Sequence, residues 1–192
     1  MKKIILASGS PRRRELLKQI GVKFKVVPSN YEEDMSLKMS PKKLAEFLSL
    51  NKALDVVKRI KGNGIVIAAD TFIVYKNHRL GKPHTKAQAF KMLNKLNGKT
   101  HSVITGFTIV DLKNKKKVTK SVVTKIYFRK LSSQQIYNYI NTGEPLDKAG
   151  AYAIQGKGAS LIKKIEGDYF NVVGLPLGAV LDEFKKFNIN VL

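Results

Sequence analysis

Residues 7–17, ASGSPRRRELL, combine small, hydroxyl and guanidinium side chains at the start of a helix. Ser10, followed by proline, is a helix-start pattern, in which a hydroxyl N-cap precedes the residue best suited to the first helical position. The first turn of a helix presents backbone N–H groups and the positive end of the dipole, which favour phosphate. Ser8 adds a hydroxyl, and Arg12 and Arg13 can each donate two hydrogen bonds to phosphate oxygens. The segment predicts a phosphate site, with an ordinary capped helix bearing solvated arginines as the alternative.

A second group of residues that could take part in catalysis or metal binding is acidic. Asp70 follows the apolar run Ile65–Ala69, and a carboxylate just beyond a buried strand occupies the place where open α/β sheets bind ligands. An aspartate there can bind a hard divalent cation or act as general base on water, or it can be a plain turn residue. Glu32, Glu33 and Asp34 form the densest acidic cluster of the chain, which either adds metal ligands or solvates a loop.

Two further segments place polar groups in non-periodic surroundings. Gly81-Lys82-Pro83 is a turn that carries a lysine. Residues 143–156, GEPLDKAGAYAIQG, mix glycine, acid, lysine and amide, and long structured segments of this kind often line sites. The three histidines lack metal-ligand spacing and are expected to be structural or on the surface.

Apolar spacing predicts the elements that position these residues. Strands alternating with helices indicate an α/β domain, and a hairpin indicates a mixed rather than a parallel sheet. No linker or repeat interrupts the chain, so we expect a single domain over residues 1–192. The predicted strands are Ile4–Ala7, Phe24–Val27, Ile65–Ala69, two runs between His101 and Lys130 that flank a basic turn, and segments around Ile162 and Val172. The predicted helices are Ser10–Ile20, Ser40–Ile60, Thr85–Leu96, Ser132–Asn141 and Leu177–Phe187, with hydroxyl N-caps at Ser10, Ser40 and Thr85.

Composition excludes several classes of protein. The chain has no cysteine, which excludes disulfides, thiolate zinc sites, iron–sulfur clusters and cysteine nucleophiles. No apolar run approaches the roughly 18 residues of a membrane span, and the apolar start is too short for a secretory signal, so a cytoplasmic location is predicted. The formal net charge of +22 suits a polyanionic partner, but the lysines are spread along the chain, as on a solvated surface.

Taken together, these segments resemble the Maf family of nucleoside triphosphate pyrophosphatases, and in particular its dTTP/UTP type. The matching blocks occur in the family's order and cover nearly the whole chain. One conservative departure is Asn97, where the family usually has serine. The blocks are residues 7–17, 32–33, 51–53, 68–71, 81–83, 89–106, 143–159 and 167–177.

The resemblance implies a fold related to the inosine triphosphatase type: a mixed central sheet flanked by helices, with a β-hairpin extension and two lobes around a cleft. It also implies hydrolysis of dTTP and UTP to the nucleoside monophosphate and pyrophosphate, dependent on Mg²⁺ or Mn²⁺. Membrane and nucleic-acid partners are not expected, and the oligomeric state stays open, with a homodimer as one possibility from the relatives. House-cleaning of modified nucleotides and a role linked to cell division are both associated with the family.

Site residues follow from the resemblance by position. Asp70 corresponds to the family's proton acceptor, and the metal falls to Asp70 and Glu33. The residues that separate the subfamilies correspond to Arg12, Thr71 and Gln155, and the 7-methyl-GTP type has tryptophan at the first of these positions. The phosphate-handling residues correspond to Ser8, Arg13, Lys52 and Lys82.

Two alternatives stay open at this point. The chain could be another hydrolase, acting on nucleotide sugars or phosphate esters in the same cleft. It could also be a basic protein that binds nucleic acid through its charge and carries a vestigial site. The second reading lacks the aromatic residues interleaved among basic ones that a single-strand stacking surface needs.

Overall fold

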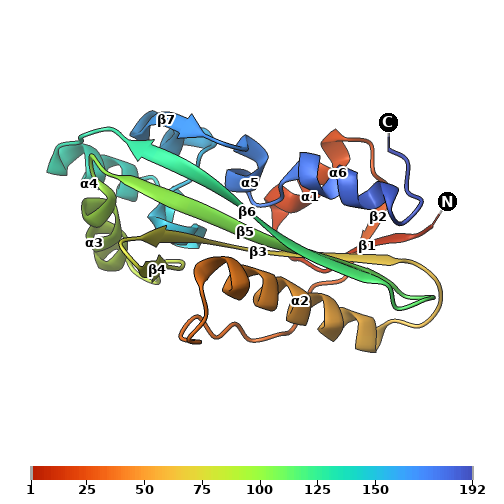
Figure 1. Cartoon of the computed structure of the whole chain (residues 1–192). Coiled ribbons are helices and arrows are strands. Elements are labelled where there is room, and N and C mark those ends of the chain that lie inside the picture. The colour runs from red at the N-terminus through yellow and green to blue at the C-terminus, as the bar shows by residue number, and fades with distance from the viewer. Residues whose placement is uncertain (1, 192) are drawn as a thin grey trace. The chain divides into compact units, whose positions relative to one another are not determined.

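The computed structural model describes residues 2–191 (Figure 1). Contacts within this part of the chain divide it into two compact units. Unit 1 comprises the chain up to Asp70, Thr105–Val122 and the chain from Gly174 onward, and unit 2 comprises Thr71–Ile104 and Val123–Val173. The single domain expected from the sequence stays a prediction.

The strands of the described chain are β1 (Ile4–Leu6), β2 (Phe24–Val26), β3 (Ile65–Tyr75), β4 (His78–Leu80), β5 (Thr100–Asp111), β6 (Lys117–Phe128) and β7 (Ile162–Glu166). They form one sheet in the order β2-β1-β3-β5-β6-β7, and β4 pairs with β3 outside this path. β1 is parallel to both its neighbours, with Leu6 opposite Val26 and Ile67. β4 and β7 pair antiparallel, with β3 and β6 respectively. The predicted mixed α/β architecture is therefore confirmed.

Three helices belong to unit 1: α1 (Pro11–Gln19), α2 (Pro41–Arg59) and α6 (Leu177–Lys185). In Figure 1, α2 lies on one face of the sheet and α1 and α6 lie on the other. Apolar residues at helical spacing turn one side of α2 toward the sheet. Ala53 and Val56 on that side pack in one buried cluster with Val66 of β3 and Val110 of β5.

The backbone of α2 approaches β5 closely at Gly106. A Cβ atom placed on Gly106 would lie 2.1 Å from the carbonyl oxygen of Ala45, a distance that no unstrained contact has. Glycine therefore lets α2 pack directly on the strand. Because Lys52 lies two helical turns after Ala45, this contact also determines where the Lys52 side chain begins.

Unit 2 contains helices α3 (Lys86–Leu96), α4 (Ser133–Asn141) and α5 (Tyr169–Val173), and 3₁₀-helices η1 (Glu144–Asp147), η2 (Ala149–Ala151) and η3 (Gly156–Leu161). The Thr85 hydroxyl caps α3 by accepting a hydrogen bond from the Gln88 N–H, as predicted. Ser132 and Gln135 form a capping box at the start of α4. The non-periodic segment 143–158 is thus a series of short, tightly turned helices.

The prediction that a strand ends at Asp70 is wrong. β3 continues through Asp70 to Tyr75 because its second half pairs antiparallel with β4. Lys76 and Asn77 have positive φ, the conformation of a two-residue hairpin turn, and they join the two strands. Asp70 nevertheless lies past the carboxyl end of β1, whose last residue is Leu6.

Two other local expectations are also corrected. Val172 lies in α5 rather than in a strand, because the Asp168 carboxylate accepts hydrogen bonds from the N–H groups of Phe170 and Asn171 and so begins a helical turn. Ser10 occupies the N-cap position of α1, but its hydroxyl makes no capping hydrogen bond, and the same is true of the N-cap residue of α2.

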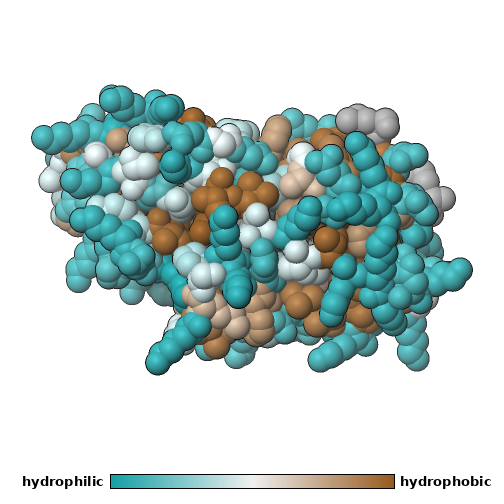
Figure 2. Space-filling view, viewed as in Figure 1, coloured by the Kyte–Doolittle hydropathy of each residue, from teal (hydrophilic) through white to brown (hydrophobic). Residues whose placement is uncertain are grey.

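No helix within residues 2–191 is both long and apolar enough to cross a membrane. Figure 2 shows hydrophilic side chains projecting at many places on the viewed face, with smaller hydrophobic areas between them. This appearance agrees with a sequence in which 36 Lys and Arg residues are spread along the whole chain.

Candidate active site

The loop between β1 and α1 is built around the Ser8 hydroxyl. Ser8 is buried, and its Oγ accepts hydrogen bonds from the backbone N–H of Ser10 at 3.2 Å and from Nη1 of Arg13 at 3.0 Å. The N–H of Ala7 donates to the carbonyl of Ile67 on β3, which holds the start of the loop against the sheet. The predicted phosphate segment therefore folds as a small-residue loop whose serine fixes the first turn of α1.

Arg13 is the buried cation of this loop. Its Nε donates to the carbonyl oxygen of Gly174 at 2.8 Å, so one edge of the guanidinium is fixed by Ser8 and Gly174 together. Burial lowers the pKa of Arg13, and the nearby charges of Asp70 and Glu33 oppose that shift. With a usual pKa above 12, the guanidinium stays charged at neutral pH, and it faces two carboxylates.

Lys52 lies between two of the predicted acidic residues. Its Nζ is 2.5 Å from Oδ1 of Asp70 and 2.5 Å from Oε1 of Glu33. The Asp70 side chain is 5% exposed and that of Lys52 12%, whereas Glu33 is 44% exposed and forms the open side of the group. Three residues far apart in the sequence, on a loop, α2 and β3, thus meet at one point in unit 1.

This point suits a divalent cation. Two carboxylate oxygens converge on a single nitrogen that carries positive charge, so the same oxygens can converge on a metal ion. Mg²⁺ is commonly held by one or two carboxylates together with substrate phosphates and water. Within residues 2–191 no group of three or more His, Asp or Glu side chains is placed to hold a metal ion. Asp70 and Glu33 are therefore a pair of carboxylates that fits a cation with few protein ligands.

The predicted residues of unit 2 are Thr71, Lys82 and Gln155, of which only Thr71 lies in a strand. Thr71 is half-buried on β3, and Lys82 and Gln155 are exposed. η2 contacts the segment of Lys82, since the Gly150 N–H donates to the carbonyl of the neighbouring Gly81 at 2.8 Å. Gly150 has a φ of +66°, which favours glycine, and a Cβ there would lie 2.3 Å from Cδ1 of Ile73 on β3 and so displace that methyl group.

The sequence of this chain, compared with known proteins, matches the family model described as Maf-like protein over residues 3–187. The chain belongs to the Maf family.

Relatives of this Maf-family chain match it from end to end. A protein of Thermoanaerobacter sp. (strain X514) named dTTP/UTP pyrophosphatase is 51% identical, over 99% of this chain and 100% of the relative. Proteins with the same name from Alkaliphilus oremlandii (strain OhILAs) and Methanosarcina mazei are 51% and 47% identical, over 100% of this chain and 100% and 97% of the relatives.

Among solved structures, the Maf-family chain is similar to a nucleoside-triphosphatase / dITP/XTP pyrophosphatase from Mycobacterium abscessus. The identity is 13%, the TM-score is 0.44, and the match covers 95% of this chain and 93% of the other. A TM-score this low does not establish a common fold, so the relation to the inosine triphosphatase type stays a prediction.

Sequence reasoning missed the partner that fixes Arg13. Gly174 lies in the block that resembles the Maf family, and its φ of +125° explains why glycine stands there. The expectation for the histidines is confirmed: His78 and His84 are exposed, and His101 is a buried structural residue whose Nε2 lies 2.6 Å from the Tyr152 hydroxyl.

Proposed function

We propose that this chain hydrolyses dTTP and UTP to the nucleoside monophosphates and pyrophosphate. The observation that carries the proposal is the convergence of Lys52, Asp70 and Glu33 beside the buried Arg13, in a chain that is 51% identical over its whole length to proteins named dTTP/UTP pyrophosphatase. The reaction needs neutralised phosphate oxygens, a positioned water and a base, and these side chains supply cations and a carboxylate at one place.

In the proposed reaction, Arg13 and Lys52 bind phosphate oxygens of the substrate, with the Ser8 hydroxyl keeping Arg13 in position. Asp70 accepts the proton of the water that attacks the phosphoanhydride between the α- and β-phosphates. Mg²⁺ or Mn²⁺, when bound by Asp70 and Glu33, neutralises charge on the phosphate oxygens. Lys82, from unit 2, is proposed as a further phosphate-binding cation.

Substrate choice is assigned to Arg12, Thr71 and Gln155. Their guanidinium, hydroxyl and amide groups can donate to and accept from the polar edge of a pyrimidine. A site built to hydrogen-bond a particular base rejects others strongly, because a wrong base leaves buried polar groups without partners. We also propose that the enzyme works in the cytoplasm, where nucleoside triphosphates are abundant, and in house-cleaning of nucleotide pools.

Pyrophosphate release from the purified protein tests this proposal. The substrates are dTTP, UTP, CTP, dCTP, GTP, ITP and 7-methyl-GTP, each with Mg²⁺, with Mn²⁺ and with a chelator in place of the metal. We expect one pyrophosphate per nucleoside monophosphate, preferential turnover of dTTP and UTP, and loss of turnover with the chelator. Preferential turnover of 7-methyl-GTP would contradict the specificity, and release of single phosphates would contradict the reaction.

A further inference from the structure

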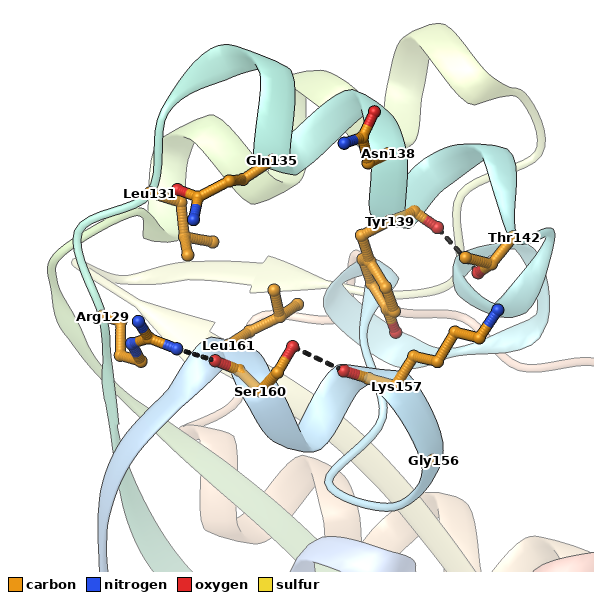
Figure 3. A pocket seen from close by; sticks show the side chains of 10 residues that line it. All are labelled: Arg129, Leu131, Gln135, Asn138, Tyr139, Thr142, Gly156, Lys157, Ser160 and Leu161. Atoms are coloured by element: carbon orange, nitrogen blue, oxygen red, sulfur yellow. Dashed lines mark hydrogen bonds between the residues drawn. The ribbon is translucent and has the colours of Figure 1, made fainter.

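Unit 2 contains a pocket of about 470 Å³ between α4 and η3 (Figure 3). This volume lies within the roughly 300–1,000 Å³ range of small-molecule sites. The apolar lining residues Leu131, Leu161 and Tyr139 are 9%, 3% and 6% exposed, so they form a mostly buried floor, and none of Thr71, Lys82 and Gln155 lines the pocket. The pocket is therefore not part of the site proposed for dTTP and UTP.

The polar lining of the pocket favours an anion. Arg129 and Lys157 stand on opposite sides of it in Figure 3, and neither aspartate nor glutamate is among its lining residues. Arg129 donates through Nη1 to the Ser160 carbonyl at 2.9 Å, which holds the guanidinium at the rim. The amides of Gln135 and Asn138 add donors and acceptors on the α4 side. The adjacent Glu144 carboxylate accepts hydrogen bonds from the Tyr139 hydroxyl and from the N–H groups of Lys157 and Gly158, which leaves the two cations to favour a phosphate group over a metal ion.

One wall of the pocket is tied to the segment that carries Gln155. The Tyr139 hydroxyl donates to Oε1 of Glu144 at 2.9 Å, and it accepts a hydrogen bond from the Ala153 N–H at 3.2 Å. The Glu144 carboxylate also accepts hydrogen bonds from the N–H groups of Lys157 at 3.0 Å and Gly158 at 2.9 Å. Tyr139 and Glu144 therefore connect the pocket to the backbone on both sides of Gln155.

This connection has little room to deform. A Cβ on Gly158 would lie 2.3 Å from the Ala153 carbonyl oxygen, and a Cβ on Gly156 would lie 2.8 Å from Oε2 of Glu144. Gly156 also has a φ of +65°. Because the segment packs this closely, a ligand that displaces Gly156 or Lys157 has to move the backbone beside Gln155 as well.

We propose that the pocket is a second ligand site, separate from the site of hydrolysis. Its ligand is a small molecule in which a phosphate group is joined to a flat ring, the chemistry of a nucleoside monophosphate. The phosphate binds Arg129 or Lys157, the ring packs on Leu131 and Leu161, and the amides of α4 contact its polar edge. Occupation of the pocket changes turnover by moving the segment around Gln155, and only this kinetic part rests on the proposed function.

Binding is tested by amide NMR of the full chain, titrated separately with UMP, uridine, ribose 5-phosphate and inorganic phosphate. We expect UMP to shift the amide signals of Asn138, Lys157 and Gly158 saturably, and the three fragments to bind more weakly. Charge reversal by Lys157→Glu or Arg129→Glu should weaken UMP binding there about tenfold or more, because a charge-assisted hydrogen bond becomes a repulsion. Lys130→Glu, the same change at an exposed residue outside the lining, is the matched control.

Absence of shifts at these amides with millimolar UMP would overturn the proposal. So would shifts that persist unchanged in both the Lys157→Glu and the Arg129→Glu proteins, because the ligand would then bind without the two cations. The NMR measurements need no turnover, so their result does not depend on the proposed pyrophosphatase activity.

The kinetic part is tested by initial rates with dTTP at several UMP concentrations. UMP should act on both kcat and KM in the parent protein, whereas in Lys157→Glu it should only compete with dTTP at the site of hydrolysis. Tyr139→Phe and Glu144→Gln, each checked for folding by thermal melting, should bind UMP in the pocket but lose its effect on kcat. Identical inhibition patterns in the parent and Lys157→Glu proteins would overturn the coupling.

Discussion

Arg13 illustrates how a single buried side chain links the phosphate loop to the end of the chain. Its bonds to the Ser8 hydroxyl and the Gly174 carbonyl require two N–H groups in the fixed geometry of a guanidinium. Arg13→Lys should lower the free energy of unfolding by about 1–3 kcal/mol, because an ammonium leaves a buried acceptor without a partner.

Denaturant unfolding of the Arg13→Lys protein measures this loss. Arg59→Lys is the matched control in the same unit, since the Arg59 guanidinium is partly exposed and pairs with Asp55 at the surface. We expect the control to change stability by less than about 1 kcal/mol. Equal losses in the two variants would contradict the role given to Arg13.

Lys52 and a metal ion use the same carboxylate oxygens. Replacing the ammonium by an apolar side chain of similar length, in Lys52→Met, leaves Asp70 and Glu33 without their shared cation. We expect the variant to bind Mn²⁺ about fivefold more tightly, the equivalent of an ion pair worth about 1 kcal/mol, while its turnover falls because a phosphate-binding cation is lost. Calorimetric titration with Mn²⁺ measures the affinity without turnover, and an unchanged or weaker affinity would contradict a metal at these oxygens.

His101 makes the stability of the protein depend on pH. Burial lowers its pKa from 6.5 to about 4, so between these values the unfolded chain binds a proton that the folded chain does not. Stability is therefore fully present above pH 6.5 and falls as the pH drops toward 4, by about 3 kcal/mol for this group.

Urea unfolding at several pH values between 4 and 7 measures that slope. His101→Gln should unfold with a shallower pH dependence, whereas His78→Gln, at an exposed histidine, should keep the slope of the parent protein. Parallel pH profiles for the parent and His101→Gln proteins would show that another group carries the dependence.

The residue types of the candidate site are readable from the sequence, but their partners are not. A serine–glycine–arginine loop before a helix indicates phosphate chemistry by itself. Arg13 and its partner Gly174 are 161 residues apart in the sequence, and Lys52 and Asp70 are 18 residues apart. Lys52 also pairs with Glu33, on the other side of it in the sequence. Such distant contacts depend on tertiary packing and cannot be predicted from the local conformational propensities of the residues.

Among the elements, α2 depends most directly on one close contact. Gly106→Ala should lower the free energy of unfolding by about 1–3 kcal/mol, because the added methyl group forces α2 away from β5. Since α2 carries Lys52, kcat/KM should also fall. Gly178→Ala on α6 is the matched control, because a Cβ there meets no atom within 4 Å and a helical alanine is favoured over glycine.

Thermal melting and activity of the two glycine variants test this role of α2. We expect opposite signs, a loss of stability for Gly106→Ala and no loss for Gly178→Ala. A Gly106→Ala protein as stable as the parent would mean that α2 can move away from the sheet at no cost.

Helices and buried strands were predictable because their signals are local. The helices from Pro11 and from Pro41 begin where serine–proline pairs stand. The continuation of β3 beyond Asp70 was not predictable, because it depends on pairing with β4 and because a charged residue inside a strand requires a distant partner such as Lys52. The helix α5 was not predicted for a different reason: Asp168 begins it inside a run of residues that favour β-strands.

For the molecule as a whole, the two units divide the proposed residues between them. Asp70 closes the first segment of unit 1 and Thr71 opens unit 2, so the proton acceptor and a proposed specificity residue are neighbours in the chain but belong to different units. The large positive charge is spread over both units and attracts any polyanion. It would therefore attract a triphosphate substrate as well as a nucleic acid. A homodimer and the lobes around a cleft stay predictions from the family resemblance.

Pyrophosphate release from dTTP by the Asp70→Asn protein tests the account most directly. Asparagine keeps the shape of the side chain but cannot accept the proton, so turnover should fall by about 10²–10⁴-fold while thermal stability stays near that of the parent. Asp55→Asn, at a partly exposed aspartate of the same unit, should retain turnover and serves as the control. An Asp70→Asn protein that releases pyrophosphate at the rate of the parent would contradict Asp70 as the base and, with it, the proposed site of hydrolysis.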